Sequence, residues 1–338
     1  MKSLLYHIIL AVMLLPPCIT AQCWEPILDF YALYQPLENI QQIHFINDST
    51  GWVHGECGTL LKTTDGGESW QQLPNMPTPT IENFFFLDEN LGWATAGRFI
   101  YRTTNGGLSW QQVIIPNNEL SVGTSQIQFI NPQTGWTMLG QGQIWRSDNS
   151  GLNWYQQLDI GTDDYAGFRF FSMYFTDALH GWILANYCNI PIYYCGSNKI
   201  IYRTQDGGQS WEEIYMTEEY LQGQIFFRND SLGWIGSYSG TCRTSDGGNT
   251  WAFTEIPFTY NLDTFINSID VIDVEFINDT LGMTALSSGY AINPYNGQSE
   301  VGFLVSTDGG QSWKRQFPLG PYFSINDDVD MTSDSVAY

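Results

Sequence analysis

Short apolar runs alternate with polar turns along most of the chain, and the alternation repeats in six similar copies. Each copy opens with an apolar run that ends in Phe, and a Gly follows six positions later. The pairs are Phe45 and Gly51, Phe86 and Gly92, Phe129 and Gly135, Phe175 and Gly181, Phe227 and Gly233, and Phe276 and Gly282. Trp follows this Gly in five copies, and Met283 follows it in the sixth. The pattern predicts four short strands in each copy of roughly forty residues, which is typical of a β-propeller blade.

A second phrase, S/T-x-D-x-G-x-x-W, closes each copy. Its acidic or amide residues are Asp65, Asn105, Asn149, Asp206, Asp246 and Asp308, and its tryptophans are Trp70, Trp110, Trp154, Trp211, Trp251 and Trp313. We expect the Asp or Asn to accept hydrogen bonds from the backbone of the turn, and the glycines to supply positive φ. We expect the Trp to fill the wedge beside the next blade. The phrase is therefore predicted to be structural, with no role in acid–base chemistry.

The spacing between the phrases varies at one end of the blades alone. The interval from Phe to Gly and the interval from box Asp or Asn to Trp are constant, whereas the other two intervals change from copy to copy. In an antiparallel four-stranded blade, the constant turns open at one end and the variable connections at the other. Binding residues commonly lie on variable loops held by a rigid scaffold. We therefore predict that the variable-loop end is the binding end.

The two ends of the chain fit the same register. Residues 1–21 read as a signal peptide, with a basic Lys2, an apolar stretch and a small residue at Ala21. Residues 22–338 are predicted to form one all-β domain, a seven-bladed propeller of four-stranded antiparallel blades. The blades start near residues 40, 81, 124, 168, 221 and 271, with a partial seventh at 324 that residues 24–28 would close. The incomplete seventh blade leads us to expect a longer chain.

Charge and composition exclude several partners. Twelve Lys and Arg against thirty-five Asp and Glu give a net charge of −23, which repels nucleic acid and anionic lipid. No apolar run after the leader is long enough to span a membrane, so we expect no membrane insertion. Cys188 and Cys195 lie in one insertion and form a candidate disulfide, whereas the pairing of Cys23, Cys57 and Cys242 stays open. No Cys or His spacing indicates a metal site, and no cofactor is implied.

The combined phrases resemble the Asp-box, or bacterial neuraminidase, repeat. Over residues 24–338 they look closest to the photosystem II stability/assembly factor-like propellers of secreted bacterial proteins. The resemblance implies a non-catalytic, protein-binding scaffold. The photosynthetic members are associated with an arginine-rich surface patch, but here four arginines recur at one repeat position: Arg102, Arg146, Arg203 and Arg243. That departure argues against a photosystem role.

A glycoside hydrolase is the competing class, because sialidases and some glucanases also use Asp-box propellers. A sialidase needs three converging arginines, and the Phe-Arg-Ile-Pro signature that supplies the first is absent. A glucanase needs two carboxylates across a sugar cleft. The candidates on the variable loops are Asp163, Asp164, Glu218, Glu219 and Asp263. The sequence pairs none of them, so whether the protein is an enzyme stays open.

Tyrosines in two long insertions are the candidate ligand-binding residues: Tyr187, Tyr193, Tyr194, Tyr290 and Tyr295. Exposed Tyr beside Asn and Gln suits a protein interface or stacking on sugar rings. The predicted function is a secreted, monomeric scaffold that binds a protein at or outside the cell envelope. The alternative is a carbohydrate-binding protein or glucanase-like hydrolase that uses the same loops.

Overall fold

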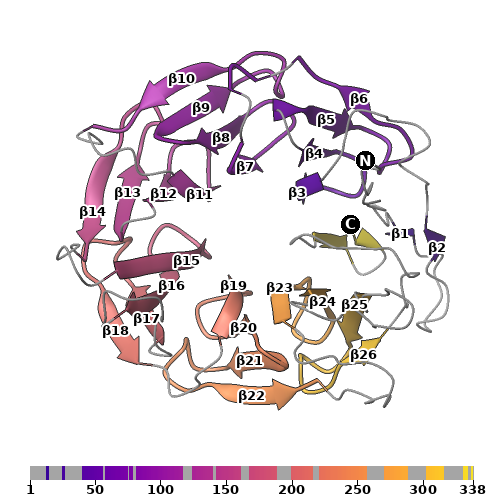
Figure 1. Cartoon of the computed structure of the whole chain (residues 1–338), viewed down its shortest axis with the longest axis vertical. Helices are drawn as coiled ribbons and strands as arrows, with labels where there is room; N and C mark the ends of the chain where they lie inside the picture. Colours follow the sequence, from indigo (N-terminus) through magenta and orange to yellow (C-terminus); the bar gives the residue numbers. More distant parts are fainter. Residues whose placement is uncertain are drawn as a thin grey trace, which may run out of the picture. The chain divides into compact units, whose positions relative to one another are not determined.

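The computed structural model describes most of the repeated region and short segments near both ends. The described residues are 13–14, 25–26, 40–55, 58–74, 76–78, 81–116, 124–139, 142–160, 167–188, 199–215, 221–256, 270–287, 302–315, 330–333 and 336–337. They form an all-β propeller of four-stranded antiparallel blades, as the sequence predicts. Within each blade, consecutive strands lie side by side (Figure 1).

Six sheets are built from four consecutive strands each, and we number them as blades one to six. Blade one contains β3 Ile40–Phe45, β4 Gly51–Gly55, β5 Leu60–Thr63 and β6 Gln71–Gln72. Blade two contains β7 Asn83–Phe86, β8 Gly92–Ala96, β9 Phe99–Thr103 and β10 Gln111–Ile114. Blade three contains β11 Thr124–Phe129, β12 Gly135–Leu139, β13 Gln143–Ser147 and β14 Tyr155–Asp159. Blade four contains β15 Gly167–Phe175, β16 Gly181–Cys188, β17 Lys199–Thr204 and β18 Glu212–Tyr215. Blade five contains β19 Leu221–Phe227, β20 Gly233–Ser237, β21 Gly240–Thr244 and β22 Ala252–Glu255. Blade six contains β23 Asp270–Phe276, β24 Gly282–Ser287, β25 Gly302–Ser306 and β26 Lys314–Arg315.

The constant spacing from Phe to Gly has a steric cause. In blade three Phe129 pairs directly with Gly135 across the first hairpin, and the Phe ring lies over the glycine. A Cβ atom built on Gly135 would stand 2.5 Å from the Phe129 ring, too close for any other residue. The same overlap occurs at the matching glycine of the other five blades. The Phe ring therefore needs a glycine as its partner.

A seventh four-stranded sheet joins the two ends of the chain. Its order is β2 Glu25–Pro26, β1 Met13–Leu14, β28 Val336–Ala337 and β27 Met331–Ser333. β28 pairs with β27 on one side and with β1 on the other. The sheet thus includes two residues of the predicted signal peptide and two from the predicted closing strand. Because only six sheets consist of consecutive strands, seven blades remains a prediction.

The chain divides into two compact units. The first comprises residues 1–72, 234–243 and 252–338, and the second comprises 73–233 and 244–251. In the second unit, the core between blades two and three gathers Trp93, Phe129 and Trp154 with aliphatic side chains of both blades. A similar cluster between blades three and four contains Trp136 and Phe175. The described part of the chain contains no helix of the length and apolarity needed to cross a membrane.

Candidate functional site

Each Asp-box forms a tight turn between the third and fourth strands. In blade four the Asp206 Oδ1 atom accepts hydrogen bonds from the Ser210 backbone amide at 2.9 Å and from the Thr204 hydroxyl at 2.9 Å. The Ser210 hydroxyl donates to the second carboxylate oxygen at 2.6 Å. These bonds, that from the Ser210 side chain first, lower the pKa of Asp206 to about 2. The carboxylate is therefore ionised and engaged in its own turn.

The two boxes with Asn keep the same geometry. The Asn105 Oδ1 atom accepts from the Ser109 amide at 2.9 Å, and the Asn149 Oδ1 atom accepts from the Asn153 amide at 2.8 Å. An uncharged amide therefore supplies the acceptor as well as a carboxylate does. The turn needs the oxygen and not the charge.

The repeated arginines connect one blade to the box of the next. In blade two, Trp93 Nε1 and Arg102 Nε both donate to the backbone carbonyl of Ser150 in box three, at 3.0 Å and 2.8 Å. In blade four, Trp182 Nε1 and Arg203 Nη1 both donate to the Gly247 carbonyl in box five, each at 3.0 Å. We call this pair of donors on one carbonyl the latch.

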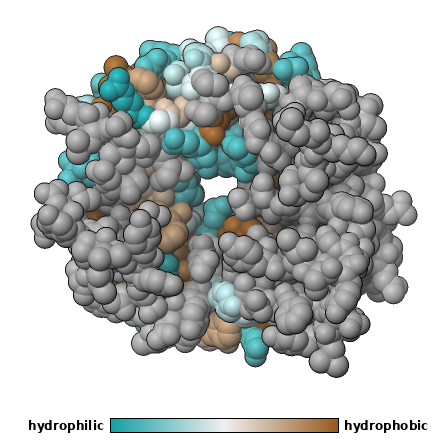
Figure 2. Space-filling view, in the orientation of Figure 1, coloured by the Kyte–Doolittle hydropathy of each residue, from teal (hydrophilic) through white to brown (hydrophobic). Residues whose placement is uncertain are grey.

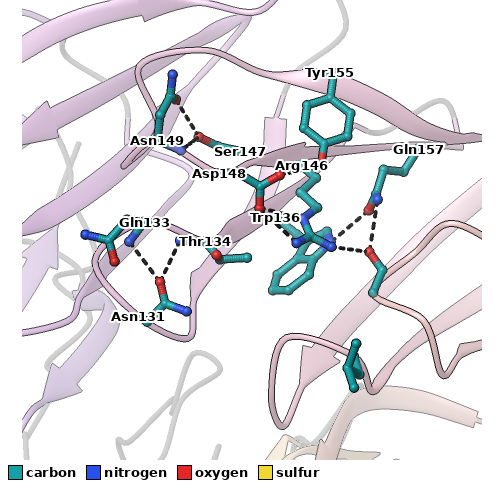
Figure 3. Close-up of polar contacts among 12 residues, drawn as sticks. Asn131, Gln133, Thr134, Trp136, Arg146, Ser147, Asp148, Asn149, Tyr155 and Gln157 are labelled. Atoms are coloured by element: carbon teal, nitrogen blue, oxygen red, sulfur yellow. Dashed lines mark hydrogen bonds and ion pairs between the residues drawn. The ribbon is translucent and has the colours of Figure 1, made fainter.

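Blade three forms the latch with an additional amide (Figure 3). Arg146 Nη1 donates to the Gly207 carbonyl at 2.7 Å, and Gln157 Nε2 donates to the same oxygen at 2.9 Å. Trp136 Nε1 donates to Gln157 Oε1 at 2.9 Å, and the Arg146 guanidinium lies 5.1 Å from the Trp136 ring. Arg102, Arg146 and Arg203 are therefore hydrogen-bonded to backbone carbonyls of the next box, whereas Arg243 lies 5.9 Å from the Trp234 ring.

The first strands of successive blades are also connected through side chains. Gln128 of β11 accepts from the Phe175 amide at 2.8 Å and donates to the Phe175 carbonyl at 3.1 Å. Asn83 of β7 accepts from the Ile127 amide at 3.0 Å. At the ends of the chain, Asp330 accepts from the Phe45 amide. Polar side chains thus satisfy backbone amides that the blade itself leaves without a strand partner.

The predicted direction of the box tryptophans is wrong. Trp154 of blade three belongs to the cluster it shares with blade two, and Trp313 of blade six donates to Thr241 Oγ1 of blade five at 3.0 Å. The box Trp therefore faces the preceding blade, and the Trp of the second strand faces the next one. Trp93 stacks on Phe129 of the next blade at 3.4 Å, and Trp154 meets the same ring edge-on at 5.9 Å. Both kinds of Trp therefore pack on the Phe ring of the first strand, one from the preceding blade and one from its own blade.

Most of the candidate binding tyrosines, cysteines and loop carboxylates lie outside the described residues. These are Tyr193, Tyr194, Tyr290, Tyr295, Cys195, Cys23 and Cys57, together with Asp163, Asp164, Glu218, Glu219 and Asp263. Tyr187 and Cys188 lie at the end of β16, where their backbones pair with Phe168 and Gly167. Cys242 is buried in β21. Among the residues that the structure describes, no group of three or more His, Cys, Asp or Glu side chains could hold a metal ion.

Sequence reasoning missed a buried lysine at the variable-loop end of blade four. Lys199 begins β17, is 6% exposed, and holds its ammonium 4.0 Å from the Phe171 ring of β15. Burial lowers the pKa of Lys199 to about 8. Phe171 is the extra residue of a bulge in β15, and such bulges re-aim side chains. The signal in the sequence was a cation at the edge of the Tyr-rich insertion.

Large apolar side chains also reach the surface at a few places. The space-filling view shows hydrophobic residues among hydrophilic ones on the described surface (Figure 2). The most exposed include Leu108, Ile114, Leu152 and Leu179. None of these four entered the sequence-based predictions, because single exposed apolar residues are common on protein surfaces.

Comparison with protein families agrees with this geometry. Residues 24–165 match the family described as photosynthesis system II assembly factor YCF48, and residues 304–315 match the BNR/Asp-box repeat. The chain is an Asp-box propeller. The predicted resemblance is thereby confirmed. A search of curated proteins found no significant match.

Solved structures similar to this Asp-box propeller fall into two groups. One is "YCF48 bound to D1 peptide", with 21% identity, TM-score 0.59, and 82% of this chain and 80% of that chain covered. Another is YCF48 from Cyanidioschyzon merolae, with 19% identity, TM-score 0.60, and 88% and 94% covered. The GH74 enzyme of Niastella koreensis has 14% identity, TM-score 0.55, and 88% and 62% covered. At these identities the likenesses show the fold alone.

Proposed function

We propose that this Asp-box propeller is a secreted, monomeric, non-catalytic scaffold that binds a partner protein through its variable-loop end. The observation that carries the proposal is the use of the repeated polar groups. The box carboxylates are bonded within their own turns, and Arg102, Arg146 and Arg203 donate to backbone carbonyls of the next box. A catalytic group has to be available to the substrate, whereas these side chains are already hydrogen-bonded to the protein's own backbone.

The loops that differ between blades are therefore the candidates for recognising a partner protein. Long connections at the variable-loop end carry Tyr187, Tyr193, Tyr194, Tyr290 and Tyr295, and Tyr is enriched at the centres of protein interfaces. The buried Lys199 and the re-aimed Phe171 lie beside one of these connections. Together they would give the end of blade four an aromatic contact surface with one cation.

The likeness to YCF48 supports a protein partner, because one of its structures is described as bound to a D1 peptide. Arg102, Arg146 and Arg203 are occupied in the latches, so we place the contact on the aromatic loops instead. We further propose seven blades in the mature protein, with residues 24–28 as the closing strand of the seventh. Removal of the predicted signal peptide would place the protein in the envelope or outside the cell.

Co-purification with matched variants tests this function. The chain from residue 22 onward would be expressed with an affinity tag in its own host, cross-linked and recovered. We expect a partner protein with the unmodified chain and with the control Phe253→Ala, which removes an exposed ring from β22. We expect loss of that partner with Tyr193→Ala combined with Tyr194→Ala.

Carbohydrate assays on the same preparations test the alternative function, carbohydrate binding or hydrolysis. A glycan array and a panel of polysaccharide hydrolysis assays should both be negative. A reproducible glycan hit that the tyrosine variant abolishes would overturn the protein-binding function in favour of carbohydrate binding. Hydrolysis would make the carboxylates of the variable loops the next residues to replace.

A further inference from the structure

Three exposed leucines lie at the Asp-box end of successive blades in the second unit. Leu108 is in the box turn of blade two, Leu152 is in the box turn of blade three, and Leu179 is in the first turn of blade four. Their exposed fractions are 55%, 44% and 51%. We call these three side chains the leucine patch. The patch lies at the opposite end of the blades from the variable loops.

Backbone contacts place the three turns next to one another. Arg102, which adjoins box two, donates to Ser150 in box three. Arg146, which adjoins box three, donates to Gly207 in box four. The Gly207 amide in turn donates to the Leu179 carbonyl at 2.8 Å. The turns that carry the leucines are therefore connected to one another from blade two to blade four.

The other blades have polar residues at these positions. The residues that correspond to Leu108 and Leu152 are Glu68, Gln209, Asn249 and Gln311. The residues that correspond to Leu179 are Ser49, Asn90, Gln133, Ser231 and Thr280. The leucines are thus departures from the repeat, all in neighbouring blades.

The two box leucines replace a side chain that stabilises the turn. Gln209 Nε2 donates to the Asp206 carbonyl at 3.2 Å, Asn249 Nδ2 to the Asp246 carbonyl at 2.6 Å, and Gln311 Nε2 to the Asp308 carbonyl at 2.9 Å. Leucine gives up this side-chain hydrogen bond and exposes its side chain to water, while its own backbone amide donates to the corresponding carbonyl, at 3.5 Å in box two and 3.4 Å in box three. Such a side chain gains nothing within the turn, so its benefit lies in a contact outside the chain.

The same two boxes have also lost their charge. Asn105 and Asn149 replace the Asp of the other four boxes, although the turn geometry is unchanged. A carboxylate beside a covered apolar contact would have to be desolvated at a large cost in free energy. In boxes two and three the apolar residue and the neutral residue therefore occur together, whereas Leu179 adjoins box four, which keeps Asp206.

Carboxylates lie in the turns that carry or adjoin the three leucines. Asp88, Asp148 and Asp177 are exposed and adjoin the patch in blades two, three and four. Asp148 is bonded to Arg146 and Asp177 to the His180 ring, and Asp88 accepts from backbone amides of its own turn. An apolar centre with an anionic rim fits an apolar segment flanked by Lys and Arg. A second copy of this chain fits poorly, because each copy carries a net charge of −23.

We propose that the leucine patch binds a basic amphipathic segment of a partner protein. This contact is separate from the loop contact proposed above, so either can fail without the other. The segment would place its apolar side chains on the three leucines and its cations beside Asp88, Asp148 and Asp177.

A designed peptide tests the patch directly. The probe is a fluorescent amphipathic helix of Leu and Lys, and a peptide of the same composition in scrambled order is its control. Leu108→Gln, Leu152→Gln and Leu179→Ser together install residues that other blades already carry. We expect the triple variant to fold and to bind the ordered peptide about tenfold more weakly or worse, as measured by fluorescence anisotropy.

The matched control is Ile114→Gln, which removes an apolar side chain that is 67% exposed at the far end of β10. This control and the Tyr193→Ala, Tyr194→Ala variant should bind the peptide like the unmodified chain. Equal binding by the triple variant, or equal binding of the scrambled peptide, would overturn the proposal. Self-association of the unmodified chain that the triple variant abolishes in sedimentation would assign the patch to a second copy and would overturn it as well.

Discussion

Blades four and six differ at two positions that face each other across one hairpin. In blade four these are Trp182 and Arg203, paired in register, and both donate to the Gly247 carbonyl of the next box. In blade six the paired residues are Met283 and Val305, which have no hydrogen-bond donor in their side chains. The Trp and the Arg are absent together. Blade one pairs Trp52 with Lys62 instead of Arg, so the Trp also occurs without the Arg. In blade four the Trp and the Arg act on one carbonyl, and we expect them to stabilise the contact with the following box together.

The largest expected effect comes from removing the indole of a latched blade. Trp182 is buried, stacks on Phe227 at 3.7 Å and donates to Gly247. Trp182→Ala should therefore destabilise the protein by about 3–5 kcal/mol, measured by urea denaturation. The control Phe253→Ala, at an exposed ring, should stay within about 0.5 kcal/mol. An equal loss of unfolding free energy for both variants would show that the latched indole contributes no more than an exposed ring.

Blades one and two differ in a buried titratable group. His54 of blade one occupies the position of Thr95 in blade two, and burial lowers its pKa from 6.5 to about 4. The unfolded chain therefore binds a proton between these values that the folded chain does not, so stability falls as pH drops from about 6.5 to about 4. The loss attributable to His54 is at most roughly 3 kcal/mol.

Comparison of His54→Thr with the unmodified chain across this pH range isolates the contribution. The variant should have a flatter stability profile between pH 6.5 and pH 4. Parallel profiles would mean that His54 does not remain neutral in the folded state.

A smaller effect is expected from the guanidinium alone. The Arg102 guanidinium donates to both the backbone carbonyl and the hydroxyl of Ser150 in the next box. Arg102→Met should cost about 1.5–3 kcal/mol, because a charge-assisted hydrogen bond to a carbonyl is lost. Arg98→Met replaces an exposed arginine of the same blade and serves as the control. A loss no larger than that of the control would show that the latch depends on the indole alone.

The smallest effect separates the charge of the box from its oxygen. Asp206→Asn copies boxes two and three and should leave stability near neutral pH almost unchanged, whereas Asp206→Ala removes the acceptor and should cost about 1 kcal/mol. The pKa of Asp206 is lowered to about 2, so its contribution is present above the usual carboxyl pKa and is lost as pH falls toward 2. The Asn variant should lack this acid-dependent loss. A large loss for Asp206→Asn at neutral pH would indicate that the charge itself is needed.

The sequence predicted the parts of the fold that repeat. The constant spacing from Phe to Gly located the first hairpin of each blade, because the Phe ring requires a glycine beneath it. The S/T-x-D-x-G-x-x-W phrase likewise predicted the bonded turn. It could not predict which neighbour the box Trp faces, since that depends on how one blade is placed against another.

The candidate site was less accessible to sequence reasoning. The recurrence of Arg102, Arg146 and Arg203 indicated a repeat position, but the carbonyl that receives them lies in another blade, 44 to 61 residues further along the chain. The contact of Lys199 with Phe171 depends on a bulge that spacing alone does not reveal. The leucine patch becomes visible only when bonded turns show which blades are neighbours.

A double-mutant cycle tests the central claim, that the repeated polar side chains act as structural units between blades. Trp182→Met and Arg203→Val install the residues of blade six in blade four, singly and together, and urea denaturation gives each loss of stability. A matched cycle in blade six uses Met283→Leu and Val305→Ala. We expect a coupling energy of about 1 kcal/mol or more in blade four and within about 0.5 kcal/mol of zero in blade six. Additive losses in blade four would contradict the account, because Trp182 and Arg203 would then stabilise the protein independently.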